Sequence, residues 1–138
     1  MATEAHLRPG LSADIELEVP LAASAAAFGN TNIDVLSTPW LIGFLEQTAA
    51  KAIESALGTG QGTVGSRVDV RHLAATPIGM HVRFHAELLE VDGRRLRFRV
   101  EGYDQRDKIA DGFHDRYVVD TGRFMEAVAL KASSPDQG

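Results

Sequence analysis

Cysteine is absent from the 138 residues of this chain. That absence excludes disulfides, thiolate metal sites and cysteine nucleophiles together, and it fits a reducing compartment. Negative charge exceeds positive charge, and the formal net charge is -5. This balance argues against nucleic acid as the main partner. The sequence contains no Gly-rich phosphate loop, no Gly-x-Ser-x-Gly elbow and no dinucleotide fingerprint.

Long hydrophobic runs are missing as well. No apolar run approaches the ~20 residues that a membrane helix needs. Residues 1–10 have no apolar core after a basic start, so we expect no signal peptide. We therefore expect a cytoplasmic protein without a membrane partner.

What remains is an ordinary globular composition, with 44% hydrophobic and 24% charged residues. A chain of 138 residues can bury a core without metals or disulfides, so we expect one domain over residues 1–138. From about residue 132 onward the tail is rich in Ser, Pro, Asp, Gln and Gly. We expect that tail to be disordered.

Residues 39–57 predict the one long helix. Ser37 or Thr38 can cap it, Pro39 suits its first turn, and Gly58 suits its end. Apolar or small side chains recur at helical spacing and form one stripe, which consists of Leu41, Phe44, Leu45, Thr48, Ala49, Ala52, Ile53 and Ala56.

Alternating patterns predict strands over residues 15–19, 64–72, 80–91, 94–103 and 107–120, with a loop or lid over residues 20–33. In the second of these, Val64, Val68, Val70 and His72 are expected on one face. The inward residues of 80–91 and 94–103 are even-numbered, and directly paired residues share a face. A two-residue Asp92-Gly93 turn would break that parity, so we expect an odd-length loop with Gly93 in a left-handed conformation.

A long helix followed by an antiparallel meander indicates an α+β fold, with a curved sheet wrapped around a central helix. A single helix leaves parts of such a sheet uncovered, and its edge strands keep free backbone groups. Dimerisation is a common remedy, so we expect a homodimer.

Glu46 and His72 are the side chains that best suit proton chemistry. Glu46 lies at the margin of the apolar stripe, where desolvation strengthens a carboxylate as a base. His72 ends a strand and points toward the helix, and an imidazole there can move protons near neutral pH. The alternatives are a glutamate that reaches water and a core histidine bonded to backbone.

Thr38 is an ordinary helix-cap candidate, yet free amides gather at a helix start, and its hydroxyl could help to hold a carbonyl. His81 and His85 lie about 13 Å apart on a strand at ~3.3 Å per residue, so we expect no metal site. An arginine cluster, Arg94, Arg95, Arg97 and Arg99, could meet coenzyme A phosphates or form a solvated face with nearby glutamates.

Across residues 35–119 the sequence resembles the fluoroacetyl-CoA thioesterase family of hot-dog enzymes. The resemblance is carried by Val-Leu-Ser-Thr-Pro-Trp-Leu-Ile-Gly-Phe-Leu-Glu at 35–46 and Val-Arg-His-Leu-Ala-Ala-Thr-Pro-Ile-Gly at 70–79. It continues with Val-Asp-Gly-Arg-Arg-Leu at 91–96 and Gly-Phe-His-Asp-Arg-Tyr-Val-Val at 112–119. The spacing of Thr38, Glu46 and His72 matches the catalytic Thr, Glu and His of the family.

The resemblance implies a hot-dog fold and hydrolysis of a small acyl-CoA without a cofactor. Glu46 would act as base or nucleophile, His72 would move protons, and Thr38 would position Glu46 or the carbonyl. Gly65 would lie near the acyl group, and Arg116 matches a family arginine. The chain departs from the family in the lid, where Gly29 and Asn32 stand near expected aromatic positions, so fluoroacetyl selectivity is not implied.

Two other functions remain open. Hot-dog folds also host hydratases and dehydratases, which would release a hydrated or dehydrated acyl-CoA instead of free CoA. A non-catalytic acyl-CoA-binding module would be stabilised by ligand without turnover. The fold alone separates none of these from a thioesterase.

Overall fold

The computed structural model describes residues 5–133. Its elements follow in the order β1 (Ser12–Glu18), α1 (Thr38–Ile53), β2 (Gln61–His72), β3 (His81–Asp92), β4 (Arg95–Asp104), β5 (Lys108–Asp120) and α2 (Thr121–Ala132). Short 3-10 helices lie at Leu21–Ala23, Ala25–Phe28 and Glu54–Ala56.

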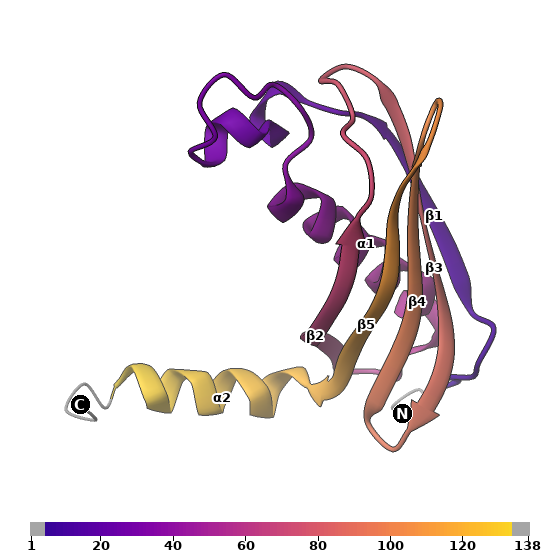
Figure 1. Ribbon diagram of the computed structural model, residues 1–138. Helices are drawn as coiled ribbons and strands as arrows, with labels where there is room; N and C mark the ends of the chain where they lie inside the picture. Colours follow the sequence, from indigo (N-terminus) through magenta and orange to yellow (C-terminus); the bar gives the residue numbers. More distant parts are fainter. Residues whose placement is uncertain (1–4, 134–138) are drawn as a thin grey trace.

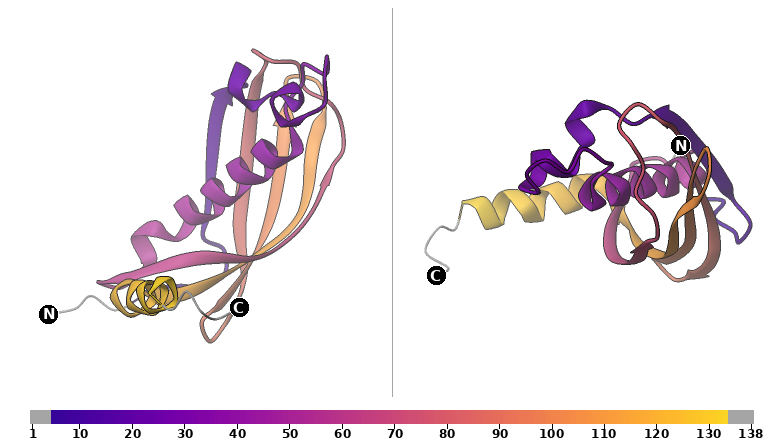
Figure 2. Two further views of the ribbon diagram at one scale, coloured as in Figure 1. Left: turned by 90° about the vertical axis from the view of Figure 1, so that its left-hand side faces the viewer. Right: turned by 45° about the horizontal axis from the view of Figure 1, so that its top comes forward.

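The strands form one antiparallel sheet in the order β1-β3-β4-β5-β2, so β1 and β2 are its edges. Helix α1 runs across the concave face of this curved sheet (Figures 1 and 2). The core between them is apolar, and its largest fully buried side chains include Phe84, Phe98, Leu41, Leu45 and Leu96. This arrangement confirms the predicted α+β fold class, a central helix wrapped by a curved antiparallel sheet.

Helix α1 and the 3-10 turn that follows it bury the whole predicted stripe, from Leu41 to Ala56. Its cap is Ser37, whose side chain accepts a hydrogen bond from the Trp40 backbone N–H at 3.4 Å. The α-helix ends at Ile53, before the predicted end, and the 3-10 turn Glu54–Ala56 continues it. The cap leaves the Thr38 hydroxyl available for another partner.

Strand β2 contains a bulge that the sequence pattern does not reveal. The register against β5 shifts between Gly65 and Arg67. Val64 therefore pairs with the exposed Tyr117, whereas Val68 pairs with the buried His114. The prediction that Val64 shares a face with Val68, Val70 and His72 is wrong for Val64, because one extra residue reverses the alternation.

The β3–β4 hairpin corrects a second expectation. Asp92 pairs with Arg95, which leaves a two-residue turn with Gly93 in the left-handed region at φ 61°. The left-handed glycine is confirmed, but the odd-length loop is wrong. A register shift after Leu88 restores the even pairing instead, so that Leu88 lies opposite Phe98 with both side chains buried.

The predicted lid over residues 20–33 lies beside the start of α1 and holds two of the 3-10 helices (Figure 1). Gly29 and Asn32 have left-handed backbones, with φ of 96° and 69°. A bridge between Ser24 and Leu36 closes the base of the lid. Gly29 and Asn32 both stand near the expected aromatic positions. Their backbone conformation suits Gly and Asn and disfavours a bulky side chain.

Helix α2 was not anticipated from the sequence. The Asp120 side chain caps it by accepting a hydrogen bond from the Arg123 backbone N–H at 3.0 Å. All its residues are exposed, and in Figure 1 it projects away from the sheet. Of the predicted disordered tail, Ala132 ends α2, and residues 134–138 lie outside the described residues. None of the helices within residues 5–133 is long and apolar enough to cross a membrane.

Candidate active site

Thr38 and His72 meet where the start of α1 faces the end of β2. Because Ser37 caps the helix, the Thr38 hydroxyl is free to reach across, and its Oγ1 lies 2.8 Å from Nδ1 of His72. His72 pairs with the buried Ala110 and faces the helix side of the sheet, as predicted. We call these two residues the Thr38–His72 pair.

The Thr38–His72 pair opens on a hollow of about 350 Å³, which is lined by Val35, Thr38, His72, Leu73, Ala74 and Ala75. Burial lowers the pKa of the His72 imidazole, and the backbone of Ala74 offsets part of that shift. Nε2 of His72 is buried and has no hydrogen-bond partner among the described residues. The imidazole is thus neutral near pH 7 and can accept or donate a proton.

Glu46 lies farther along α1 and faces Arg116 on β5. Its Oε2 is 3.7 Å from Nη1 of Arg116, and 41% of the Glu46 side chain is exposed. The two side chains border a hollow of about 300 Å³, which is lined by Gly43, Glu46, Gln47, Ala50 and Arg116. We call these two residues the Glu46–Arg116 pair.

Gly65 lies directly against the Glu46–Arg116 pair. A Cβ at this position would lie 3.0 Å from Oε2 of Glu46 and 3.5 Å from Nη1 of Arg116. Any larger residue would displace the carboxylate. The structure therefore brings together Glu46, Gly65 and Arg116, which the sequence analysis had named from separate segments.

Arg116 is buried, with 8% of the residue exposed, and is held by three other contacts. Its Nε donates to Thr63 Oγ1 at 2.9 Å, and its Nη2 donates to the Thr63 carbonyl at 3.0 Å. Nη1 lies 3.2 Å from Nε2 of His114. Sequence reasoning named neither Thr63 nor His114 as a site residue. Alternation along β5 turns His114 and Arg116 to the same inner face, and that pattern could have linked these two residues.

The two pairs lie apart within one chain. Thr38 and Glu46 are eight residues apart on α1, about 12 Å along the helix axis at ~1.5 Å per residue. That separation exceeds one hydrogen bond several times over. A single chain therefore presents two separate groups of polar side chains, one with an imidazole and one with a carboxylate.

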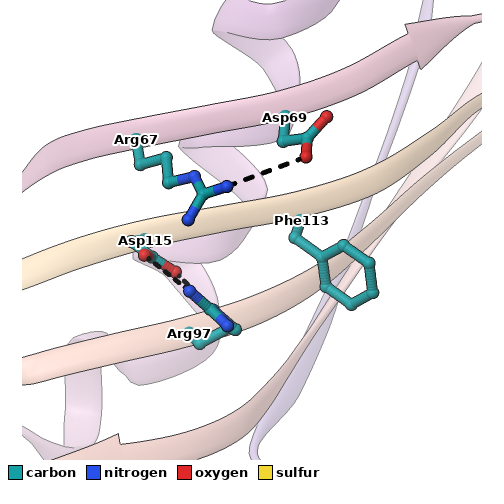
Figure 3. A pocket seen from close by; sticks show the side chains of 5 residues that line it. All are labelled: Arg67, Asp69, Arg97, Phe113 and Asp115. Carbon is teal, nitrogen blue, oxygen red and sulfur yellow. Dashed lines mark hydrogen bonds and ion pairs between the residues drawn. The ribbon is translucent and has the colours of Figure 1, made fainter.

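The opposite, outer face of the sheet carries a different hollow of about 60 Å³, which is lined by Arg67, Asp69, Arg97, Phe113 and Asp115 (Figure 3). Arg97 donates to both oxygens of Asp115, at 2.9 and 3.2 Å, and this contact lowers the pKa of the carboxyl. Arg99 is similarly bound to Asp111. These arginines pair with carboxylates on their own sheet, which favours the solvated face over coenzyme A binding.

Within residues 5–133, no cluster of three or more His, Asp or Glu side chains is placed to hold a metal ion. His85 is instead bonded to Asp14, with its Nδ1 2.5 Å from Oδ1.

Comparison with known proteins points to one chemistry. Residues 21–122 match the family model described as fluoroacetyl-CoA-specific thioesterase. The chain is 38% identical over 98 residues to the fluoroacetyl-CoA thioesterase of Streptantibioticus cattleyicolor, a match that covers 71% of this chain and 70% of that protein.

Solved structures agree. A solved structure of a fluoroacetyl-CoA thioesterase superposes with a TM-score of 0.84 at 32% identity, covering 91% of this chain and 97% of the other. A hot-dog-like protein from Thermanaerovibrio acidaminovorans superposes with a TM-score of 0.83 at 22% identity, covering 91% and 93%. The second match concerns the fold alone, and it confirms the expected hot-dog architecture.

Proposed function

The chain belongs to the fluoroacetyl-CoA-specific thioesterase family and is an acyl-CoA thioesterase, and we propose that Thr38, Glu46 and His72 are its catalytic residues. The observation that supports this assignment is the presence of two complementary half-sites on the concave side of the sheet. One supplies a carboxylate beside a buried arginine, and the other supplies a neutral imidazole beside a hydroxyl. Together they supply the base or nucleophile and the proton carrier of the proposed hydrolysis.

In the proposed reaction, a small acyl-CoA places its carbonyl between the carboxylate and the imidazole. Glu46 either attacks the carbonyl carbon or takes a proton from the water that attacks it. When water attacks, the proton that it loses passes to the neutral His72, and the resulting imidazolium protonates the CoA thiolate as the carbon–sulfur bond breaks. When Glu46 attacks, the thiolate leaves first, and the water that hydrolyses the acyl–Glu46 anhydride supplies the same proton through His72. One water is consumed, and the products are a carboxylic acid and CoA. Thr38 holds the imidazole through Nδ1 while this proton moves.

Gly65 and Arg116 are proposed to contact the substrate beside Glu46. Gly65 supports this role because its missing side chain leaves space against the carboxylate oxygen. Arg116 supports it because its guanidinium is held from behind by Thr63 and His114, and it turns Nη1 toward Glu46. A fixed cation in a buried place stabilises negative charge that develops during acyl transfer.

We propose that the working unit is a homodimer and that each active site takes one half-site from each subunit. Strand β2 pairs with β5 on one side, and in the described chain its other side is a sheet edge. Such an edge invites pairing with a second copy. When two β2 strands pair antiparallel about a two-fold axis, a residue near one end of the first strand lies beside a residue near the opposite end of the second strand.

An axis midway between Gly65 and His72 would place Gly65 of one subunit beside His72 of the partner subunit. Glu46 contacts Gly65, so the carboxylate would then approach the imidazole of the second chain. The proposed location is the cytoplasm, because CoA thioesters are intracellular metabolites. Activity found only outside the cell would contradict it.

The test is release of free CoA from a panel of short acyl-CoA thioesters, with identification of both products. The proposal predicts a thiol and a free acid in equal amounts. A hydrated acyl-CoA without free CoA would identify a hydratase. Thermal stabilisation by acyl-CoA without any turnover would identify a binding module.

A further inference from the structure

His114 is a buried titratable group that the proposed reaction does not use. It lies on the inner side of β5, is 2% exposed, and its ring packs against Phe98 at a centroid distance of 6.3 Å. Its Cε1 would lie 3.2 Å from a Cβ at position 65. The imidazole is therefore enclosed directly behind the Glu46–Arg116 pair.

The two ring nitrogens of His114 have partners that determine its tautomer. Nη1 of Arg116 can only donate, so Nε2 of His114, at 3.2 Å, must accept and carries no proton. Nδ1 lies 2.8 Å from the Arg67 carbonyl, which can only accept, so Nδ1 must carry the proton. The contacts require a neutral imidazole in the Nδ1–H form.

The charged groups around His114 favour that neutral form. Burial is the largest influence and lowers the pKa of the imidazole, and the Arg116 cation lowers it further. The Arg67 carbonyl, Glu46 on α1 and Asp115 on β5 oppose the shift. A proton on Nε2 would point a donor at a donor and would force the guanidinium away.

We propose that His114 is a positioning residue, whose unprotonated Nε2 holds the Arg116 guanidinium against Glu46. The proposal rests on the proposed function, because it explains how the carboxylate half-site keeps its geometry. Protonation of His114 releases Arg116 and turns that half-site off. In this proposal His114 acts through Arg116 and takes no part in the bond-making steps.

Two variants separate the two hydrogen bonds of the ring. In His114→Gln the amide oxygen can take the place of Nε2 and still accept from Arg116. In His114→Asn the shorter amide can donate to the Arg67 carbonyl but cannot reach Arg116. With acetyl-CoA as the probe at pH 8, we expect His114→Asn to lose about 10- to 100-fold in kcat, the scale of one hydrogen bond to a charged group. We expect His114→Gln to lose less than about 3-fold.

The pH profile gives a readout that a merely structural role would not change. In the wild type, the acid limb of log kcat/KM should include the protonation of His114 as well as that of His72. In His114→Gln the limiting slope of that limb should fall by one proton. An unchanged slope, or equal losses of kcat in the two folded variants, would contradict the proposal.

The tautomer can be measured on the wild-type protein even if a variant fails to fold. In ¹⁵N-histidine-labelled protein at pH 8, His114 should show a protonated Nδ1 and an unprotonated Nε2. A protonated Nε2 would overturn the proposal. Failure of the proposed function looks different, because full activity in Glu46→Gln would remove the carboxylate half-site altogether.

Discussion

The two half-sites of this protein are built in opposite ways. The Thr38–His72 pair forms at the meeting of a helix start and a strand end, and a single hydrogen bond of 2.8 Å joins it. The Glu46–Arg116 pair joins the middle of α1 to β5 beside Gly65. Contacts with Thr63 and His114 hold the arginine. The first pair contains a titratable imidazole, whereas the second combines a carboxylate with a buried guanidinium.

This difference is the basis of the proposal that the two half-sites complement each other. In the proposed reaction the carboxylate half-site supplies the base or nucleophile, and the imidazole half-site carries the proton to the CoA thiolate. Because about 12 Å of helix separates them in one chain, two subunits are the simplest way to combine them.

The largest expected effect comes from removing the reactive group of either half-site. Glu46→Gln and His72→Ala should each lower kcat by at least ~100-fold, the usual scale for a lost acid–base group. The matched controls are Glu54→Gln and His81→Ala, which change exposed residues outside both half-sites. Steady-state thiol release would measure all four variants. Near wild-type rates in a folded Glu46→Gln or His72→Ala protein would remove that residue from the mechanism.

A smaller effect should follow from crowding the carboxylate half-site alone. Gly65→Ala would bring a methyl group to 3.0 Å from Oε2 of Glu46 and should lower kcat by about 10-fold or more, because small misplacements of catalytic groups are costly. Gly62→Ala on the same strand meets only Thr121 Oγ1 at 3.2 Å and serves as the control. Equal rates in the two variants would show that the space at position 65 does not matter.

The neutral histidines should make stability depend on pH. Burial lowers the folded-state pKa of both His72 and His114 below the value in the unfolded chain. The unfolded chain therefore takes up protons first, and stability is lost as the pH falls below ~6.5, by at most about 1.4 kcal/mol per pH unit for each group.

Unfolding by urea between pH 7 and 5 would measure this dependence. That window lies above the pKa of the paired carboxyls Asp111 and Asp115, which arginine contacts lower. The pH dependence should be weaker in His114→Gln than in the wild type. An identical dependence in the two proteins would mean that His114 does not titrate differently on folding.

The smallest expected effect concerns the lid next to the Thr38–His72 pair. The lid has Gly29 and Asn32 where aromatic residues are expected. Their left-handed backbones disfavour bulky side chains. We expect weak or no preference for fluoroacetyl-CoA over acetyl-CoA in kcat/KM. A preference of ~1000-fold, equivalent to about 4 kcal/mol, would show that another feature creates a selective pocket.

The sequence predicted most of the framework that positions these half-sites. The stripe from Leu41 to Ala56 and the inner faces of β3 and β4 were identified, because periodic burial leaves a direct trace in residue order. The bulge between Gly65 and Arg67 was not, since one extra residue leaves no compositional mark. Helix α2 was missed because all its residues are exposed, so no buried stripe marks it.

For the site, residue type and the family resemblance named Thr38, Glu46, His72, Gly65 and Arg116. They did not reveal which of these residues touch. The role of Ser37 as the cap, which frees Thr38 for His72, depends on local geometry. The contact of His114 with Arg116 depends on strand register and on a tautomer, and neither can be obtained from the order of residues alone.

The central claim is that each active site combines half-sites from two subunits, and subunit mixing tests it most directly. Inactive Thr38→Ala and Glu46→Gln proteins would be mixed under conditions that exchange subunits, with mixed dimers quantified by native mass spectrometry. One of the two sites in each mixed dimer would then be intact, so activity should recover to about half that of the wild type per mixed dimer. Mixing Thr38→Ala with His72→Ala is the control, and it should give no recovery because both lesions affect the same half-site. No recovery from the first mixture, with mixed dimers present, would contradict the claim and mean that Thr38 and Glu46 act within one chain.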